Sequence, residues 1–475
     1  MLTYSLDKKK KAPLYEQLYD CIRLDITQGK ISGGEKLPSK RALAEHLGIS
    51  KVTVEAAYAQ LAAEGFIYSV EKKGYYAETV AQMPAAVPIT EKADLQPDLI
   101  SADICSNTVE PDSFPVSSWS KLMRATLLDG GSKLFSAAPY NGVLPLREAI
   151  CKYLADNRGM SVSPSQLIIG AGTEYLYGLI VQLLGNDKVF AIENPSYGKI
   201  PEVYTAHGAS CVFVDMDKNG VNISELDSKG AQVVHISPAH HFPTGTVTSQ
   251  KRRFELLEWT NAAEGRYIIE DEYDSEFRFA GRPIPPIQAS DADGRVIYIN
   301  TFSKTISPSV RISYMILPPT LSEKFVERLG FYSCTVASFE QYTLARFIEN
   351  GGFERHIRRM KRQYKMLRND LILQIRSSPI ADRAEIIEQD SGLHFILKID
   401  TEVNDTLLKK ACADRGARLS FLSEYYKGRN GPEHMMLVNY SGITREKFSF
   451  VLEILNESLE KCESMCYKCT KATDT

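Results

Sequence analysis

Short runs rich in β-branched residues alternate with helical stretches through most of this chain, and this alternation limits the possible folds more than any other feature. Six such runs are QLIIG, KVFAIE, SCVFVD, AQVVHIS, RYIIED and RVIYIN, all between residues 166 and 300. Strands separated by helices form parallel sheets with right-handed crossovers. We therefore expect an α/β domain over residues 99–463, in which a last strand, LHFILKI, begins a smaller C-terminal α+β subdomain near His394.

Residues 1–78 follow a different pattern, typical of a small helical domain. Apolar residues recur every four positions from Leu14, which predicts a helix over 14–28, and Pro38-Ser39 begins a short second helix that stops at Gly48. Ser50 caps a third helix from Lys51 to about Glu64. The β-like runs FIYSV and GYYAE follow, joined by a basic turn at 71–74. Three helices and a β-wing make a winged helix-turn-helix.

Length and composition agree with two domains. The chain has 475 residues, and one hydrophobic core stops growing near roughly 250 to 300 residues. No apolar run approaches the ~20 residues of a membrane span, and no apolar segment follows the N-terminal lysines, so we expect a cytoplasmic protein without membrane contact. Residues 79–98 are rich in proline and small residues and predict a linker, and 464–475 predict a frayed tail.

The nine cysteines are odd in number and scattered, which indicates reduced thiols. Cys462, Cys466 and Cys469 have a C-x3-C-x2-C spacing that can hold a metal or an iron-sulfur cluster. They lie in the predicted tail without a fourth ligand nearby, so we predict no metal site.

The net charge of -3 does not by itself indicate a nucleic-acid partner, but its distribution favours one slightly. Residues 1–78 hold 12 Lys and Arg against 10 Asp and Glu, which leaves +2 on this part and -5 on the rest. In a helix-turn-helix the start of the second helix reads base edges, here Ser50, Lys51 and Thr53. Candidate phosphate contacts are Ser39, Lys40, Arg41, Lys72 and Lys73. Any one of these taken alone is equally well explained as a solvated polar residue.

The whole string LPSKRALAEHLGISKVTVEAAYAQLAAEGFIYSVEKKGYYA is more specific, and it resembles the winged-helix head of GntR-type regulators over about residues 12–78. The resemblance implies that Ser39, Arg41, Lys51, Thr53 and the wing around Gly74 contact double-stranded operator DNA. The wing departs from the family, since KKGYY stands where Gly-Ser-Gly is more common.

The second domain offers each group that pyridoxal phosphate (PLP) chemistry needs. A lysine must form a Schiff base and a carboxylate must keep the pyridine nitrogen protonated, roles for which Lys304 and Asp271 are the candidates. Tyr273 lies two residues after Asp271, on the same side of the strand end, and can donate to the phenolate oxygen. Gly172 and Thr173, in a glycine-rich helix start, and Arg311 can bind the phosphate.

The order of these motifs resembles the type I aminotransferase fold over roughly residues 99–460. GAGTEYLYGL, NPSYGKI, SPAHHFPTG, IIEDEYDSEFRF and TFSKTISPSVRISYMILP occur in the family's order. The resemblance places Thr301 and Arg311 at the cofactor phosphate and stacks Tyr197 on the cofactor ring. Enzymes of this family often use a tyrosine to reach the partner subunit's phosphate, and the available residue here is Tyr140, displaced by about three positions.

A GntR-type head followed by this body resembles the MocR/GabR-type PLP-dependent regulators, which implies a homodimer controlled by a small-molecule effector. Leu437 stands where aminotransferases usually carry a carboxylate-binding arginine, while Lys199 lies where some relatives carry one. His241-Phe242 replaces the asparagine that enzymes favour near the phenolate oxygen. We therefore expect a transcription regulator rather than an enzyme, sensing an amine or amino acid, or PLP itself. An active aminotransferase with an appended head is the alternative. The basic cluster Glu354-Arg355-His356 is expected on a solvated or interdomain face.

Overall fold

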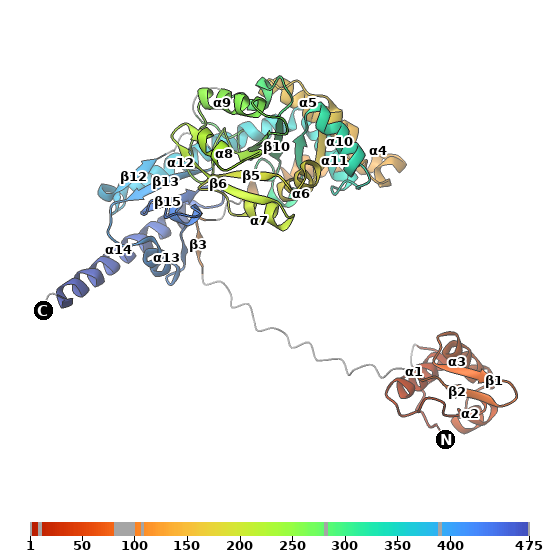
Figure 1. Ribbon diagram of the computed structural model, residues 1–475. Helices are drawn as coiled ribbons and strands as arrows, with labels where there is room; N and C mark the ends of the chain where they lie inside the picture. The colour runs from red at the N-terminus through yellow and green to blue at the C-terminus, as the bar shows by residue number, and fades with distance from the viewer. Residues whose placement is uncertain are drawn as a thin grey trace. The chain divides into compact units, whose positions relative to one another are not determined.

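The computed structural model describes residues 2–7, 12–79, 100–105, 109–279, 284–387 and 392–473, with side chains described as far as residue 464. The chain divides into two compact units, Met1–Asp98 and Leu99–Thr475, which we call the head and the body (Figure 1). Apart from residue 79, the predicted linker 79–98 and residue 99 lie outside the described residues.

The head is the winged helix-turn-helix that the sequence predicts. Its elements are α1 (Leu14–Thr27), α2 (Lys40–Leu47), α3 (Lys51–Ala63), β1 (Ile67–Val70) and β2 (Gly74–Ala77). Ser39 and Ser50 cap α2 and α3, because their Oγ atoms accept from the backbone N–H of Ala42 and Thr53 at 3.2 and 3.1 Å. Strands β1 and β2 pair antiparallel, with Tyr68 opposite Tyr76. The core is fully buried and consists mainly of Leu18, Ile22, Leu43, Val54, Tyr58 and Leu61.

The body is built on an eight-stranded sheet in the order β4-β11-β10-β9-β8-β5-β6-β7. The strands are β4 (Leu167–Gly170), β5 (Val189–Asn194), β6 (Ser210–Asp217), β7 (Gly220–Val221), β8 (Val233–Ile236), β9 (Tyr267–Glu272), β10 (Val296–Thr301) and β11 (Ser313–Ile316). All six predicted runs are strands of this sheet. The six predicted runs are parallel to one another, as expected. The sheet as a whole is mixed, because β11 is antiparallel to both β4 and β10 and the short β7 is antiparallel to β6. The connection from β10 to β11, residues 302–312, contains no α-helix that could carry the chain across the sheet to a parallel position.

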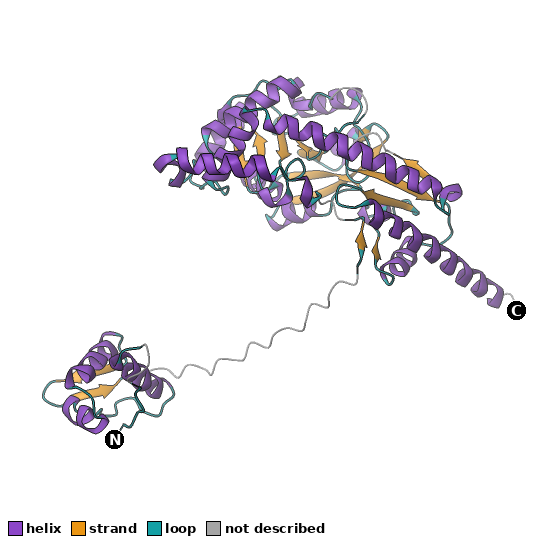
Figure 2. Ribbon diagram, turned by 180° about the vertical axis from the view of Figure 1, so that it is seen from behind, coloured by secondary structure: helices purple, strands orange, loops and turns teal. Residues whose placement is uncertain are grey.

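Helices cover both faces of this sheet (Figures 1 and 2). They are α4 (Val116–Asp129), α5 (Leu144–Arg158), α6 (Thr173–Leu184), α7 (Lys199–Ala206), α8 (Ile223–Ser228), α9 (Gln250–Asn261), α10 (Pro319–Leu329), α11 (Ser338–Glu349) and α12 (Gly352–Ser377). Neighbouring residues of β9 show the two layers: Ile269 packs with residues of α6, α7 and α10, whereas Ile268 packs with residues of α8 and α9. Burial on both faces explains why these strands read as continuous apolar runs.

A smaller subdomain follows the long helix α12, which runs along the body in Figure 2. Its three-stranded antiparallel sheet contains β12 (Ala384–Ile387), β13 (His394–Ile399) and β15 (Met435–Asn439), and α13 (Asp405–Ala413) and α14 (Arg445–Thr473) pack nearby. The short strand β14 (Ala417–Arg418) pairs with β3 (Ala102–Asp103).

The structure corrects two expectations about this subdomain. It begins at β12, before the strand at His394, and β15 rather than β13 is its last strand. The predicted frayed tail is helical, because α14 continues to Thr473. The apolar side chains of Leu452, Leu455 and Leu459, spaced three and four residues apart, are buried and anchor this helix to the body.

No helix among the described residues is both long and apolar enough to cross a lipid bilayer.

Candidate functional site

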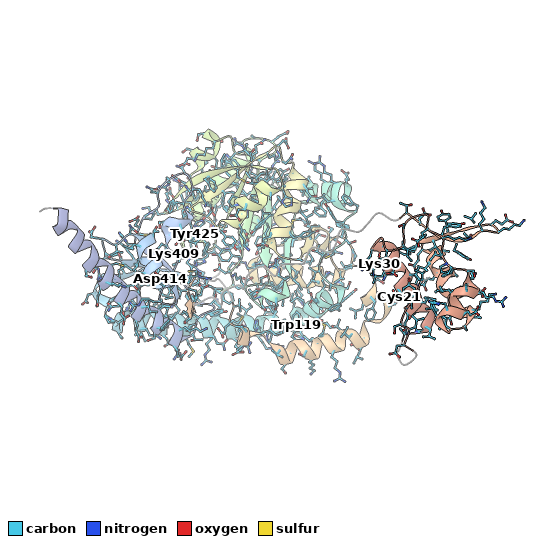
Figure 3. The ribbon with its side chains drawn as sticks, turned by 90° about the horizontal axis from the view of Figure 1, so that it is seen from below. Cys21, Lys30, Trp119, Lys409, Asp414 and Tyr425 are labelled. Atoms are coloured by element: carbon cyan, nitrogen blue, oxygen red, sulfur yellow. The ribbon has the colours of Figure 1, made fainter. Side chains whose placement is uncertain are left out.

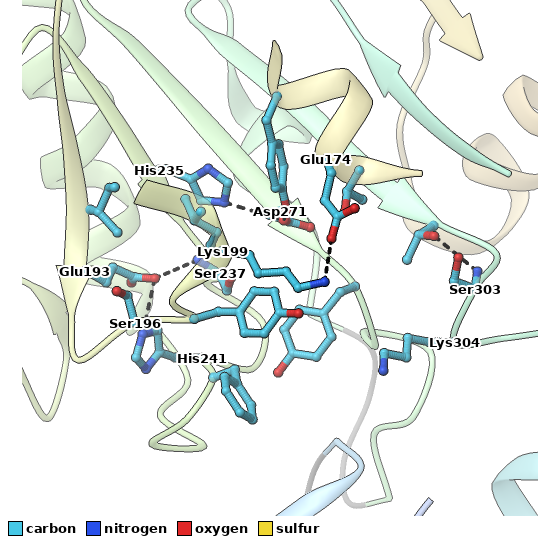
Figure 4. Close-up of a pocket in the computed structure, with 18 of the residues that line it drawn as sticks. Glu174, Glu193, Ser196, Lys199, His235, Ser237, His241, Asp271, Ser303 and Lys304 are labelled. Atoms are coloured by element: carbon cyan, nitrogen blue, oxygen red, sulfur yellow. Dashed lines mark hydrogen bonds and ion pairs between the residues drawn. The ribbon is translucent and has the colours of Figure 1, made fainter. Parts of the chain in front are cut away.

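A pocket of about 480 Å³ lies in the body, at the carboxyl ends of the parallel strands β5, β8, β9 and β10 (Figure 4). Open α/β sheets bind ligands at this edge, and the volume suits a small molecule or cofactor. Eight predicted residues were assigned to the cofactor and one to the effector. All of them line the pocket except Gly172: Thr173, Tyr197, Lys199, Asp271, Tyr273, Thr301, Lys304 and Arg311.

Asp271 is the buried anion at the bottom of the pocket, with 5% of its surface exposed. One carboxylate oxygen, Oδ2, accepts from the Tyr177 hydroxyl and lies 3.4 Å from Nε2 of His235. Nδ1 of His235 in turn lies 2.7 Å from the Tyr204 hydroxyl. The other oxygen, Oδ1, is buried without a hydrogen-bond partner. A buried carboxylate oxygen without a partner calls for a donor, and the protonated ring nitrogen of PLP would be a suitable one.

Lys304 lies in the loop after β10 and is partly buried. Burial lowers the pKa of its ammonium group from 10.5 to about 8, although the carboxylate of Asp274 acts in the opposite direction. A lysine with a lowered pKa has a larger neutral fraction at neutral pH, and the neutral amine is the nucleophile that attacks an aldehyde.

We expect the rate at which apo-protein takes up PLP to rise roughly tenfold between pH 7 and pH 9 and then level off, since Lys304 loses its proton near pH 8. With an unperturbed lysine, the rate of PLP uptake would keep rising through pH 10. Stopped-flow absorbance of PLP uptake against pH measures this profile. A rate that climbs steadily with no plateau below pH 10 would contradict the lowered pKa.

Three predicted residues meet where α6 begins. Gly172 has φ +99°, a backbone conformation that other residues rarely adopt, and a Cβ there would displace the guanidinium group of Arg311. Thr173 is the first residue of α6 and Arg311 remains half exposed, beside Glu174 at 3.7 Å. The amino end of a helix together with an arginine forms an anion site suited to the PLP phosphate.

The remaining predicted residues lie around this center. The Thr301 hydroxyl accepts from the Ser313 hydroxyl at 2.8 Å, and Tyr197 is 43% exposed at the mouth. Tyr273 donates its hydroxyl to the carbonyl of His240 at 3.0 Å, so donation to a cofactor requires that hydroxyl to change partner. Nζ of Lys199 lies 2.9 Å from the Glu174 carboxylate.

Several pocket residues escaped the sequence analysis, above all His235, Tyr177 and Glu193. Burial raises the pKa of Glu193 to about 8, so this side chain holds a proton at neutral pH. His235 and Glu193 lie near the carboxyl ends of their strands, a position that could have marked them as candidates. The Tyr177 contact depends on how α6 packs on β9, which the chain order alone does not show.

The pocket wall on the C-terminal subdomain is apolar. Leu437 is fully buried on β15, opposite Ile396 of β13, and packs in one cluster with Phe242 and Tyr425. The rings of Phe242 and Tyr425 lie 5.3 Å apart and both line the pocket. Figure 3 labels Tyr425 on this subdomain. Leu437 itself does not line the pocket and lies behind these two rings, in the same apolar cluster.

The cluster 354–356 was expected on a solvated or interdomain face, and this expectation is wrong for His356. Arg355 is exposed, but His356 is buried and its Nε2 lies 2.8 Å from the carbonyl oxygen of Thr305, the residue after Lys304. The apolar neighbours of His356 on α12 bury this side of the helix.

Tyr140, the candidate for reaching the partner subunit's phosphate, stacks on Phe325 within the body, with the ring centroids 5.9 Å apart.

The interpretation of the C-terminal cysteines falls mainly on side chains outside the described residues. Cys462 is buried, and the side chains of Cys466 and Cys469 lie outside the described residues. Among the described residues no group of three His, Cys, Asp or Glu side chains is placed to hold a metal ion.

The candidate DNA-reading residues lie together on α2, α3 and the wing of the head. Arg41 and Lys51 are exposed, but Nζ of Lys51 lies 3.5 Å from Glu55, which neutralises part of its charge. Ser39, Ser50 and Thr53 take part in the helix caps, and Lys73 and Gly74 are exposed on the wing. Val52, which the sequence analysis did not select, is 72% exposed at the start of α3, where an apolar group can contact a thymine methyl.

Replacing Arg41 by alanine is expected to weaken binding to duplex DNA and to lower the salt slope of log K by about 1, because one phosphate contact is lost. Fluorescence anisotropy with a labelled duplex at several salt concentrations measures both quantities. Arg23→Ala is the matched control, since Arg23 pairs with Asp20 on α1. An unchanged slope in Arg41→Ala would remove Arg41 from the interface.

Two family models match the chain. "Bacterial regulatory proteins, gntR family" covers residues 14–76, and "Aminotransferase class I and II" covers residues 103–430. The solved structure of the multiple substrate aminotransferase from Thermococcus profundus superposes with a TM-score of 0.68 at 23% identity, covering 78% of this chain and 93% of that one. This likeness shows the type I aminotransferase fold of the body.

Similar full-length proteins combine both parts. The uncharacterized HTH-type transcriptional regulator YdeL of Bacillus subtilis is 35% identical over 93% of this chain and 96% of its own length. The probable rhizopine catabolism regulatory protein MocR of Rhizobium meliloti is 29% identical over 92% of each chain. The pyridoxine biosynthesis transcriptional regulator PdxR of Corynebacterium glutamicum is 26% identical over 96% and 98%. The chain therefore belongs to the MocR/GabR-type family of GntR regulators, HTH-type transcription regulators whose aminotransferase-like domain binds PLP.

Proposed function

We propose that this regulator senses a small molecule in its PLP pocket and converts the binding into a changed affinity for operator DNA, without steady turnover. The observation that carries this proposal is that Leu437 on β15 is a fully buried apolar side chain. We expect an aminotransferase to carry its carboxylate-binding arginine at this position. The wider proposal includes a homodimer, with residues 79–98 joining head and body in each subunit.

The cations of the pocket support sensing over catalysis. Among the described residues only Lys199, Lys304 and Arg311 contribute Lys or Arg side chains to the lining. Lys304 and Arg311 are assigned to the cofactor, and Lys199 already pairs with Glu174. A lysine is a single point charge rather than a bidentate fork, so its grip on a carboxylate is weaker. An amino acid is therefore held less firmly here than in an aminotransferase.

The pocket residues can each serve the cofactor in a distinct way. PLP, when bound, supplies an aldehyde for a primary amine and a ring that accepts electrons. Lys304 would attach the aldehyde, and Oδ1 of Asp271 would accept the hydrogen of the ring nitrogen. Gly172, Thr173, Thr301 and Arg311 would hold the phosphate. Tyr197 would stack on the ring, and Tyr273 would donate to the phenolate oxygen.

Effector and DNA must then influence each other equally, because a coupling free energy between two sites is reciprocal. An effector that raises operator affinity tenfold is itself bound tenfold more tightly in the presence of operator, a coupling of about 1.4 kcal/mol.

A second candidate is that PLP itself is the effector. PdxR is similar to this chain over nearly its whole length, and its name refers to pyridoxine biosynthesis. The apolar wall around Phe242 and Tyr425 also suits a site in which no amino acid has to be gripped. An active aminotransferase remains the third candidate, because the cofactor groups are all present.

One experiment separates the three. Operator affinity is measured for full-length apo-protein, for PLP-loaded protein and for PLP-loaded protein with a panel of amines and amino acids, while keto-acid formation is followed in parallel. A changed affinity on amine addition without repeated turnover supports the amine sensor, and a change with PLP alone supports PLP sensing. Sustained turnover with unchanged operator affinity would reject the sensing proposal.

Replacing Lys199 by alanine is expected to weaken the response to carboxylate-bearing amines by roughly tenfold or more, since one charged hydrogen bond is lost. Amines without a carboxylate should respond as in the wild type. Titration of the cofactor absorbance with each compound gives the apparent affinities, and Lys218→Ala, exposed elsewhere on the body, is the control. Equal weakening for both classes of amine would contradict a carboxylate role for Lys199.

A further inference from the structure

The body contains a second cavity that shares no lining residue with the PLP pocket. It lies between α4 and the amino-terminal turns of α12 and has a volume of about 420 Å³. Figure 3 labels Trp119 on α4, the helix that forms one side of it, and Figure 2 shows α12, which forms the other. The cavity is large enough for a small ligand.

Among the described residues, the Lys and Arg side chains that line this cavity are not balanced by any acidic side chain. Lys121 of α4 and Arg355 and Arg359 of α12 line it, and no Asp or Glu of the described residues does. None of these three cations has a carboxylate within ion-pair distance in the described part of the chain. A hollow lined by one sign of charge concentrates the opposite ion.

The beginning of α12 adds partial positive charge. Gly351, the residue before this 26-residue helix, makes no side-chain cap, and Gly352 lines the cavity. The first amides of a helix lack partners within it and carry partial positive charge. The Gly352 amide donates to Asn350 at 2.8 Å. Glu354 lies on the same turn and opposes this charge, but its side chain does not line the cavity.

His356 connects this cavity with the loop of the cofactor lysine. Its side chain is buried and lines the cavity, with Nδ1 3.2 Å from Nη2 of Arg359. Its other ring nitrogen, Nε2, lies 2.8 Å from the carbonyl oxygen of Thr305, next to Lys304. The same Nη2 of Arg359 also donates to the carbonyl of Ser113 at 2.7 Å, which fixes the guanidinium at the cavity edge.

We propose that this cavity is a second ligand site, for a small oxyanion with two or more negative charges. A phosphate group and a polycarboxylate share the required chemistry, because both offer several oxygens to the two arginine guanidinium groups and the Lys121 ammonium group. The site is independent of the sensing proposal for the PLP pocket.

Isothermal titration of full-length, PLP-loaded protein with inorganic phosphate and, separately, with citrate tests the site. Loading the cofactor first keeps added phosphate out of the PLP pocket. Saturable uptake is expected for at least one of the two ions, and which one binds identifies the class. Arg355→Ala and Lys121→Ala should each weaken the affinity for that ion roughly tenfold. Arg358→Ala is the matched control, because Arg358 is exposed on the same helix but does not line the cavity.

Three results would overturn this assignment. The first is an absence of saturable uptake of both ions by the wild-type protein. The second is equal weakening by Arg358→Ala, which would indicate a general effect of surface charge. The third is a loss of operator affinity in Arg355→Ala with anion uptake unchanged, which would make DNA phosphates the occupant of this surface.

Discussion

Lys304→Ala is expected to abolish the visible absorbance band of lysine-bound PLP and to weaken cofactor retention by at least about two powers of ten, or about 3 kcal/mol. The covalent bond to Nζ is lost, while the contacts proposed for Asp271 and Arg311 remain. Absorbance spectra before and after dialysis measure both effects. Any response of operator binding to amines should disappear with the band.

Lys199→Ala is the matched control for this variant, since it removes a second pocket lysine without touching the attachment point. We expect it to keep the band. A visible band of normal height in Lys304→Ala would mean that another lysine attaches the cofactor, and the assignment of Lys304 would be wrong.

Val54→Asp is expected to unfold the head and abolish operator binding while the PLP band is retained. Val54 is fully buried on α3 among Leu18, Ile22 and Tyr58. An unpaired buried charge costs roughly 3–5 kcal/mol or more, a large share of the stability of a small domain. The body has its own hydrophobic clusters and keeps them. Anisotropy with labelled operator and absorbance on the same sample measure the two effects.

Ala59→Asp introduces the same side chain on the exposed face of α3 and serves as the control. Its head should stay folded, as followed by thermal unfolding. Simultaneous loss of the PLP band in Val54→Asp would show that head and body do not fold independently, contrary to their division into two compact units.

Patterns local in the chain predicted a large part of this architecture. The four-residue apolar period of α1, the capping serines Ser39 and Ser50, and the six β-rich runs all correspond to observed elements. These signals are reliable because helix caps and strand burial depend on neighbouring residues in the chain. Motif order likewise selected eight residues that the folded chain brings to one pocket.

Other features depend on contacts between distant segments. The buried chain from Tyr204 through His235 to Asp271 and Tyr177 joins two helices, α7 and α6, and two strands, β8 and β9, with partners up to 94 residues apart. Its residues carry no common local pattern, so only their packing reveals it. The same holds for His356, which looked like part of a basic surface and instead supports the loop of Lys304.

The sequence by itself therefore determined the element types, the two-domain order and the family, because periodicity and motif order can be recognised from the order of residues alone. Tertiary structure alone decided the antiparallel course of β11, the partners of Asp271 and the cationic cavity between α4 and α12. Those properties arise from pairing and burial across the fold, where the energy of a side chain depends on neighbours that are remote in sequence.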